Sequence, residues 1–408
     1  MTAVDTLPWL ASVGAGRWQM SGILAAQRAG MRVLAMDGDA NAPGLATADH
    51  GVVVDIRDPQ SVIDAVAESN ITLAGAISFA AEVGVRAVGA LRVHFSLPGP
   101  GFPVLDQLTD KAAQRRTWEE AGLRNPVFWR IVESVDAGLT AIADAEAPVI
   151  VKPVDSAGSR GVTRLETHTS RNHCSQALAH AISGSRSQRA IVESVLPGKE
   201  YTVETFADGD STYVLAITVK EKVPDTGGTV ANELATPTDS PKTQRSIAAL
   251  AVDALEAVGY RDGPGHVEIM HDPTSGPALV EAAGRGAGFM VFEGLVPAAS
   301  GYDIVTSTAR RAIGATVNAP SIARQAVVLR FFPSARGQVI GFSGFEDANS
   351  LPGVEANPFV KVGDRISRAQ SDGDRLGYIL ATGADPHEAR ARANTAEKLI
   401  RFDIAADD

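Results

Sequence analysis

Cysteine is almost absent from this chain, and its scarcity excludes several kinds of site. Cys174 is the only cysteine in 408 residues, so neither an internal disulfide nor a cysteine-built zinc or iron–sulfur centre can form. No window approaches the roughly 20 apolar residues of a membrane-spanning helix. The N-terminal stretch MTAVDTLPWLASVGAG also lacks the basic region of a signal peptide. We therefore expect a soluble, cytoplasmic protein.

Basic residues are fewer than acidic ones, with 37 Lys and Arg against 48 Asp and Glu and a net charge of −11. Such a chain repels the phosphates of nucleic acid and of anionic membranes, so we expect neither as a partner. A small anionic ligand must instead meet locally placed lysines and arginines. The length predicts two or three domains.

Strand and helix patterns alternate through the first hundred residues, as in PWLASVGAG, WQMSGILAAQRAG and MRVLAMDGD. They predict a doubly wound parallel domain over 1–105. The stretch FSLPGPGFPVLDQLTD is rich in Pro and Gly and predicts a crossing between domains, followed by the helix KAAQRRTWEEAG and a small lid over 106–190. Strands dominate 191–408 and predict a large antiparallel sheet backed by helices. A tail from about 325 ends in the predicted helix PHEARARANTAEKLIRF, and the expected class is thus mixed α/β and α+β.

Two acidic residues stand out in the segment HVEIMHDPTSGPALVEAAGRGAG. HVEIM and ALVEAA are typical of strands, and the turn-rich HDPTSGP between them predicts a hairpin. Glu268 and Glu281 can then face each other at its centre. Two carboxylates held in this way suit a hard cation.

A lysine and a glycine-rich loop stand far upstream, in PVIVKPVDSAGSRGV. Lys152 ends an apolar strand, and the Ser- and Gly-rich residues after it can turn backbone N–H groups toward phosphates. Combined with the two carboxylates, this loop predicts a site for a nucleoside triphosphate and its metal.

These motifs, in this order, resemble the ATP-grasp superfamily along nearly the whole chain. Within it the L-amino-acid ligase group is similar through HVEIM, LVEAAGRGAGF, PGVEANPFVKVGDRI and LGYILATGADPHEA. The resemblance implies a dinucleotide-like N-terminal domain, a mobile lid and a larger C-terminal domain, with ATP between two sheets. It also implies ATP and Mg²⁺ as cofactors.

The resemblance assigns the phosphates to Lys111, in LTDK, and to Lys152. A solvated helix end and a strand-edge lysine are the alternative interpretations. The covering loop would consist of Ser156, Gly158, Ser159 and Gly161, although such residues also form ordinary surface turns.

The stretch AIVESVLPGKEYTVE resembles the family's adenine-binding hinge. By that resemblance Glu193 and the backbone of Ser194 and Leu196 would meet the purine edge. Glu200 would accept hydrogen bonds from the ribose hydroxyls. The alternative for Glu200 is an exposed carboxylate on a sheet.

The resemblance assigns Mg²⁺ to Glu268 and Glu281, since this ion prefers oxygen ligands. Many ATP-grasp enzymes have an Asn two residues after the second Glu, where this chain has Ala283, so the number of ions stays open. Arg285 matches the family arginine that stabilises the tetrahedral intermediate. A structural arginine paired with a carboxylate is the alternative.

Two other patterns in the sequence imitate different functional motifs. Gly14, Gly16 and Gly22, with Asp37 after the next strand, imitate a dinucleotide fingerprint, but the third glycine comes too late. His266 and Glu268 spell the H-x-E of zinc deaminases, but no P-C-x-x-C follows. We expect His266 to order the hairpin or to line the pocket.

The sequence thus predicts an ATP-dependent carboxylate–amine ligase that forms an amide or peptide bond through an acyl phosphate. Its partners would be a small carboxylate and an amine, both expected to be amino acids, and a homodimer is expected. Thr218 to Pro237 would shape the substrate pocket. Another ATP-grasp enzyme, of carboxylase or purine and carbamoyl type, and a nucleotide-binding regulator without turnover are the alternatives.

Overall fold

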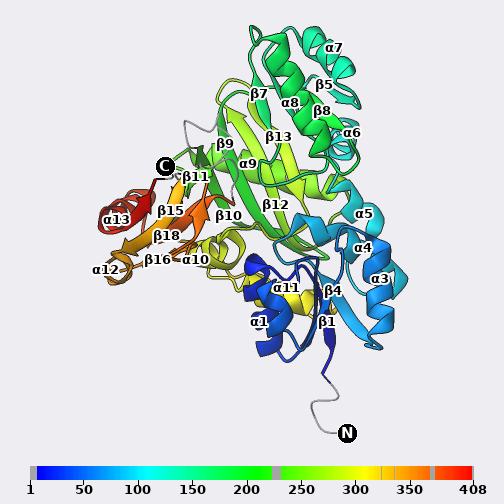
Figure 1. Cartoon of the computed structure of the whole chain (residues 1–408), viewed down its shortest axis with the longest axis vertical. Helices are drawn as coiled ribbons and strands as arrows, with labels where there is room; N and C mark the ends of the chain where they lie inside the picture. Colours follow the sequence, from blue (N-terminus) through cyan, green and yellow to red (C-terminus); the bar gives the residue numbers. More distant parts are fainter. Residues whose placement is uncertain (1–6, 223–230, 323, 335, 368–372, 407–408) are drawn as a thin grey trace.

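The computed structural model describes residues 7–222, 231–322, 324–334, 336–367 and 373–406. Within these ranges the strands form a parallel sheet, a small antiparallel sheet, a large antiparallel sheet of eight strands and a minor sheet of three. The predicted mixed fold class is therefore confirmed. Figure 1 shows the parallel domain at one end of the molecule, the small antiparallel unit at the other, and the large sheet between them.

The N-terminal domain is a parallel sheet in the order β3-β2-β1-β4. The two central strands are buried along most of their length, as expected where helices cover both faces of a parallel sheet. Its strands are β1 (Trp9–Val13), β2 (Arg32–Asp37), β3 (His50–Val53) and β4 (Leu73–Ile77), and its helices are α1 (Met20–Arg28), α2 (Pro43–Thr47), α3 (Pro59–Glu68) and α4 (Val85–His94).

The crossing after this domain contains a helix that the sequence analysis missed. α5 (Phe102–Gln107) begins inside the Pro- and Gly-rich stretch predicted to cross between domains, with Pro103 in its first turn, where a missing N–H breaks no helical hydrogen bond. The predicted helix after it is present as α6 (Lys111–Glu120). The Asp110 side chain caps α6 by accepting hydrogen bonds from the N–H groups of Ala112 and Ala113.

The lid unit is a four-stranded antiparallel sheet in the order β5-β8-β6-β7, covered by two helices that form a hydrophobic core of their own with it. Its last strand ends at Ser194, a few residues beyond the predicted boundary at 190. The domain boundaries themselves stay predictions. Its elements are β5 (Trp129–Val132), α7 (Val135–Ala145), β6 (Val149–Pro153), β7 (Thr163–Leu165), α8 (Arg171–Ser183) and β8 (Ala190–Ser194).

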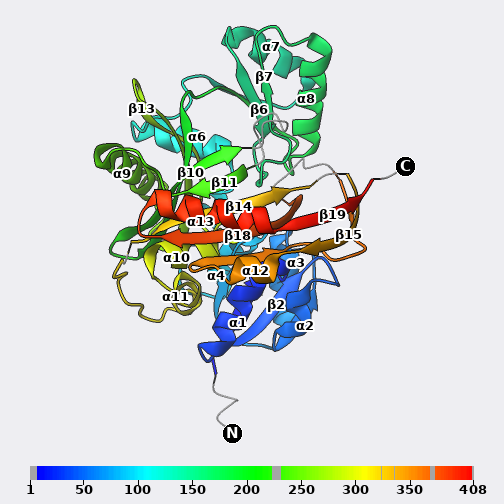
Figure 2. The ribbon, with the colours of Figure 1, turned by 90° about the vertical axis from the view of Figure 1, so that its left-hand side faces the viewer.

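The large sheet has the order β13-β12-β9-β10-β11-β14-β18-β16, with antiparallel neighbours throughout. Strands of the C-terminal tail continue it without a break, so the tail closes the fold; Figure 2 shows them crossing the molecule between the lid and the N-terminal domain. Its strands are β9 (Lys199–Asp208), β10 (Thr212–Lys222), β11 (Ala231–Ala235), β12 (Asp262–Asp272), β13 (Gly276–Ala283), β14 (Ala326–Pro333), β16 (Val354–Pro358) and β18 (Arg375–Gly383).

The predicted final helix is wrong at its end. α13 (Pro386–Leu399) stops because Ile400 is extended, and β19 (Arg401–Ala405) then pairs with β15 (Gly337–Ser343). The alternating RFDIA pattern after the helix carried this signal. The remaining elements are α9 (Pro241–Ala257), α10 (Val296–Ser300), α11 (Ile304–Ala312), α12 (Phe345–Asn349), β17 (Arg365–Ile366) and the short helices η2 (Arg17–Gln19), η3 (Glu82–Gly84) and η5 (Val291–Leu295).

The short helix η5 is a π-helix that carries a buried carboxyl group. Phe289 and Met290, just before it, both have positive φ, at 55° and 67°. Glu293 lies within η5, and one of its carboxylate oxygens has no hydrogen-bond partner among the described residues. Burial raises the pKa of Glu293 from 4.5 to about 7.

This burial makes stability depend on pH. Because the native state holds the Glu293 proton more tightly than the unfolded chain, the contribution of Glu293 to stability should fall as pH rises from 4.5 to about 7. Glu293→Gln should remove that loss. The free energy of unfolding of the variant, relative to that of wild type, should therefore increase by on the order of 3 kcal/mol from pH 4.5 to pH 8. Urea unfolding at both pH values measures the difference, with the exposed Glu120→Gln as control. A variant-to-wild-type difference that does not change with pH would contradict the assignment.

Candidate functional site

The predicted hairpin is present, and its register brings the two acidic residues together. Glu268 on β12 lies directly across from Glu281 on β13. Val267 and Ile269 point into the hydrophobic core, so Glu268 faces the opposite side of the sheet. A bulge at Val280 interrupts the pairing beside the two carboxylates, which is how strands re-aim side chains next to a site.

Helix α6 covers the free edge of β13. The Gln114 side chain donates a hydrogen bond to the carbonyl of Ala282 (2.8 Å) and accepts one from its N–H (3.1 Å). Arg115 donates to the carbonyl of Val280 at the bulge (2.7 Å). This edge is therefore protected from pairing with another strand. The same contacts place Lys111, the first residue of α6, with its Nζ 3.0 Å from Glu281 Oε1.

Glu193 joins the lid sheet to α6 through a buried ion-pair cluster. Its Oε1 lies 2.5 Å from Lys152 Nζ and its Oε2 lies 2.9 Å from Arg115 Nη2. Burial opposes ionisation of Glu193, but the charges of Arg115 and Lys152 hold the pKa of its carboxyl below the usual value. Burial lowers the pKa of Lys152, and Glu193 counters that effect only in part.

The strand register arranges polar side chains in rows on one face of the large sheet. Glu200 pairs with Met270, Thr202 with Glu268, and Glu204 with His266, each pair one step further along β9 and β12. This ordering follows from the alternation of side chains along a strand.

Lys220, on β10, connects two of these rows and was not singled out from the sequence. Its Nζ lies 2.6 Å from Glu200 Oε1 and 2.6 Å from Glu268 Oε1. Burial disfavours its charge, but the two carboxylates outweigh burial and raise its pKa. Lys222, on the same face of β10, pairs with the other oxygen of Glu200 at 2.6 Å. Both lysines fall within the range 218–237 predicted to shape the substrate pocket, of which 223–230 lie outside the described residues.

A cavity of about 1000 Å³ lies between the lid sheet and the large sheet and gathers most of the predicted residues. Gly161 and Arg285 are not among its lining residues. Lys111 Nζ also donates to the carbonyl of Ser156 (2.6 Å), which ties the glycine-rich loop to α6. The predicted residues that line it are Lys111, Lys152, Ser156, Gly158, Ser159, Glu193, Ser194, Leu196, Glu200, Glu268 and Glu281.

Gly161 has a structural reason for its place in the loop. Its φ is +73°, and a Cβ there would approach Pro153 to 2.9 Å. Ser159 and Gly158 also have positive φ, at 61° and 68°. Consecutive left-handed turns of this kind can point backbone N–H groups toward one anion.

Arg285 is held by the N-terminal domain. Its Nε lies 2.5 Å from Glu82 Oε2, and its Nη1 donates to the carbonyl of Gly286 (3.0 Å). Burial would lower the pKa of Arg285, but Glu82, Glu281 and Glu204 together outweigh burial and raise that pKa. Arg285 is thus paired with a carboxylate, as the structural alternative predicts. This pairing leaves room for a catalytic role, because the same side chain could serve both purposes.

His266 stands beside Glu268 and opposite Ala283. Its Nδ1 lies 2.6 Å from Glu204 Oε1 and its Nε2 lies 3.6 Å from Glu268 Oε1. Burial disfavours the imidazolium, but Glu204 and Glu268 together outweigh burial and raise the pKa of His266 to about 9. The contact with Glu204 was not foreseen, although the alternation in EYTVE places Glu200 and Glu204 on one face.

In the N-terminal glycine turn, the acidic residue Asp37 forms hydrogen bonds within the turn. Gly14 has φ +105°, and Asp37 accepts hydrogen bonds from the N–H groups of Ala15 (2.8 Å) and Asp39 (3.0 Å). Asp37 therefore closes the turn instead of presenting a free carboxylate for a ribose. This geometry disfavours the dinucleotide interpretation.

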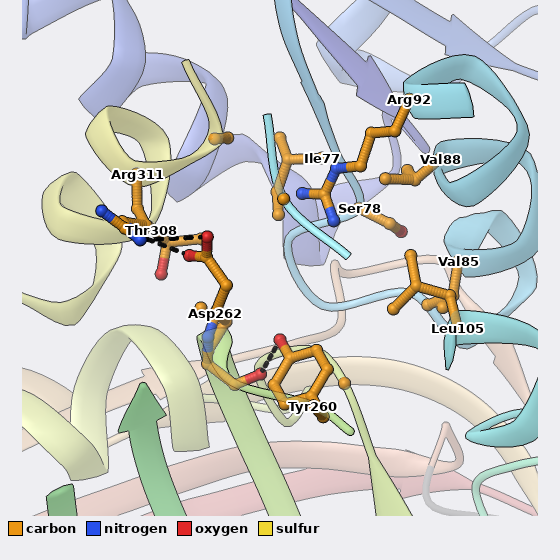
Figure 3. Close-up of a pocket in the computed structure, with 15 residues that line it drawn as sticks. Ile77, Ser78, Val85, Val88, Arg92, Leu105, Tyr260, Asp262, Thr308 and Arg311 are labelled. Carbon is orange, nitrogen blue, oxygen red and sulfur yellow. Dashed lines mark hydrogen bonds and ion pairs between the residues drawn. The ribbon is translucent and has the colours of Figure 1, made fainter. Parts of the chain in front are cut away.

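A second cavity lies where α4, β12 and α11 meet, as Figure 3 shows. Asp262 pairs with Arg311 on one side of it (2.7 Å), and the Arg92 guanidinium enters from the other. Its volume is about 20 Å³, room for a single water molecule. It is too small for a substrate.

Comparison with known proteins bears on the larger cavity. Residues 145–293 match the model of the ATP-grasp domain, and residues 330–405 match that of the L-amino acid ligase C-terminal domain 2. The chain therefore contains an ATP-grasp domain. The prediction of an ATP-grasp ligase that uses ATP and Mg²⁺ is confirmed at this level.

Individual relatives of this ATP-grasp chain differ in their reactions. The formate-dependent phosphoribosylglycinamide formyltransferase of Burkholderia mallei is 27% identical over 95% of this chain and 94% of its own length. The L-amino acid ligase of Bacillus licheniformis superposes with a TM-score of 0.83 at 19% identity, covering 98% of this chain and 99% of that one. An N5-carboxyaminoimidazole ribonucleotide synthetase in complex with ADP superposes with a TM-score of 0.73 at 17% sequence identity, covering 96% of this chain and 97% of that one. These two structural likenesses establish the fold.

No helix in the described part of this ATP-grasp chain has the length and apolar character needed to cross a membrane.

The cluster around Glu193 yields a stability test. Arg115→Met leaves a buried carboxylate with one cation instead of two and should lower the free energy of unfolding by about 3–5 kcal/mol. Arg116→Met, next to it on the exposed face of α6, should change that energy by less than about 0.5 kcal/mol. Urea unfolding followed by circular dichroism compares the two. Equal effects of both substitutions would show that the cluster contributes no special stability.

Proposed function

We propose that this protein is an ATP-dependent carboxylate–amine ligase that joins amino acids or similar small molecules. A carboxylate oxygen of one substrate attacks the γ-phosphorus of ATP, giving an acyl phosphate and ADP. The amine of the second substrate then attacks the acyl carbon, and inorganic phosphate leaves. The observation that carries the proposal is the cavity whose walls combine lysines, a glycine-rich loop and the facing pair of Glu268 and Glu281.

The nucleoside would lie at the lid end of the cavity. Ile150 and Met270 are apolar lining residues from the lid sheet and the large sheet, and a purine could pack between them. The Glu193 carboxylate is committed to Lys152 and Arg115, so the backbone of Ser194 and Leu196 is better suited than that carboxylate to meet the purine edge. The ribose hydroxyls would donate to Glu200, whose two carboxylate oxygens also pair with Lys220 and Lys222.

The phosphates would meet Lys111, Lys152 and the glycine-rich loop. Magnesium fits between them and the hairpin, since Glu268 and Glu281 offer oxygen ligands. No group of three His, Cys, Asp or Glu converges as a metal site in the described ranges, so further ligands would come from phosphate oxygens and water. When bound, the ion would neutralise charge that develops on the phosphates.

The carboxylate substrate would lie beyond the metal, toward Arg285. Along the sheet the polar rows follow one another from Glu200, through Glu268, to Glu204 and His266. His266 lies opposite Ala283, two residues before Arg285, so Arg285 is at the end of the sheet face away from the nucleoside. Glu82 orients Arg285 from behind. A fixed guanidinium can stabilise the oxyanion that forms when the amine attacks.

The C-terminal match favours amino acids among the substrates of the superfamily, because that segment is of L-amino acid ligase type. The formate-dependent relative supports a second candidate, transfer of a formyl group to phosphoribosylglycinamide. Both reactions begin with the activation of a carboxylate by ATP, and they differ in the acceptor.

The proposal is tested by measuring ADP release with all pairs of proteinogenic L-amino acids, and with formate plus phosphoribosylglycinamide. We expect release to depend on an amino-acid pair and to disappear in Glu281→Gln, because that amide removes a charged metal ligand while preserving its shape. ADP release with formate plus phosphoribosylglycinamide, and with no pair of amino acids, would replace the amino-acid hypothesis by the second candidate. Nucleotide binding without release under any condition would favour a regulator.

A second test separates the two half-reactions. Arg285 lies outside the lining of the cavity, so Arg285→Ala should leave ATP affinity nearly intact yet cut ligation by about 10²-fold or more. Lys152→Ala should weaken ATP binding as well as turnover, since its charge meets phosphate in the ground state. Calorimetry and product formation measure the two quantities, and Arg285→Lys, which keeps a cation beside Glu82, controls for folding. Loss of ATP binding in Arg285→Ala would make this arginine a phosphate ligand.

A further inference from the structure

Each of the two facing carboxylates already has a lysine partner from the same cavity. Lys111 Nζ lies 3.0 Å from Glu281 Oε1, and Lys220 Nζ lies 2.6 Å from Glu268 Oε1. The four side chains are largely shielded, with exposed fractions of 6% and 12% for the lysines and 21% and 23% for the acids. Positive charge therefore occupies the place where a divalent cation would be bound.

The two lysines come from elements on opposite sides of the hairpin. Lys111 begins α6, outside the edge of β13, whereas Lys220 reaches from β10 across β9 to Glu268. Lys220 also contacts Glu200, and Lys111 also contacts the glycine-rich loop at Ser156. Each ammonium thus lies between a carboxylate of the hairpin and a part of the cavity assigned to the nucleotide.

This charge arrangement works against a bare metal ion. Two like unit charges about 4 Å apart in a partly buried site repel by roughly 4 kcal/mol, and a divalent ion doubles that energy, so the ion must displace an ammonium or remain against its repulsion. A metal–nucleotide complex brings phosphate oxygens that can accept both ammonium groups. Lysine is suited to such an exchange, because its flexible stem lets the charge move between neighbouring acceptors.

We propose that Lys111 and Lys220 are exchangeable counter-ions that make the site select a metal–nucleotide complex and reject free divalent metal. As the complex enters, each ammonium transfers from its carboxylate to a phosphate, and Glu268 and Glu281 become free to bind the metal. Lys220 is then a positioning residue for both the metal and the phosphates. This inference rests on the proposed function, since it requires that nucleotide and metal occupy this cavity.

Binding of Mn²⁺ tests the inference without any turnover, since carboxylate sites for Mg²⁺ also accept Mn²⁺, whose free form gives a paramagnetic resonance signal. Without nucleotide, Lys220→Met should bind Mn²⁺ at least about tenfold more tightly than wild type, because one repelling charge is gone. Lys222→Met is the matched control: it loses a lysine that contacts Glu200 from the same strand and does not touch Glu268. It should bind Mn²⁺ as weakly as wild type.

Two further variants keep the result interpretable. The double variant Lys220→Met with Glu268→Gln should lose the gained affinity, which places the metal at Glu268. Lys220→Gln removes the charge while keeping a polar side chain, and it should reproduce the gain if Lys220→Met does not fold. Wild type that binds free Mn²⁺ as tightly as Lys220→Met, or an equal gain in Lys222→Met, would overturn the inference.

The outcome for nucleotide separates this inference from the proposed function. Calorimetry with Mn²⁺ and ADP should show binding to wild type even though Mn²⁺ alone binds weakly. Absence of nucleotide binding would reject the proposed function and this inference with it. Nucleotide binding together with tight binding of free Mn²⁺ by wild type would reject the inference alone.

Discussion

The register of β12 between its two neighbours is the constraint on which the site depends. It sets Glu268 opposite Glu281 on one side and opposite Thr202 on the other. A slip of one residue would turn Glu268 into the apolar core and bring Val267 or Ile269 to the cavity. The burial of those two side chains therefore fixes the position of the carboxylate. One strand pairing therefore sets both the hydrophobic core, on one face of β12, and the carboxylate of the cavity, on the other face.

Charge balance is the second constraint, because the cavity holds many desolvated ions. Lys111, Lys152 and Lys220 each pair with a carboxylate, and Arg115 adds a second cation at Glu193. Burying single ions would cost several kcal/mol each, whereas close pairing offsets much of that cost. A ligand with both phosphates and a metal can exchange partners with this set without leaving a buried charge alone.

The sequence predicted what short-range patterns determine. Alternating apolar residues and turn residues predicted the hairpin of β12 and β13. The lysine followed by a glycine-rich loop predicted the wall of the cavity that faces it. It could not predict the contacts that depend on which strands are neighbours. Lys220 reaches Glu268 only because β9 lies between β10 and β12, and Glu82 reaches Arg285 only because the N-terminal domain packs on the loop after β13. The end of α13 was missed because the helical pattern was extended over a strand of alternating residues.

The C-terminal segment is coupled to the cavity through the same sheet. β14 continues the sheet beside β11, where Glu233 pairs across the strands with Arg330. Arg390, on α13, lines the cavity and lies 2.9 Å from the other oxygen of Glu233. A buried carboxylate shared by two arginines resists separation of the tail from the sheet, since either cation alone would leave Glu233 undercompensated. The segment matched by the L-amino acid ligase family is therefore part of the cavity wall through Arg390.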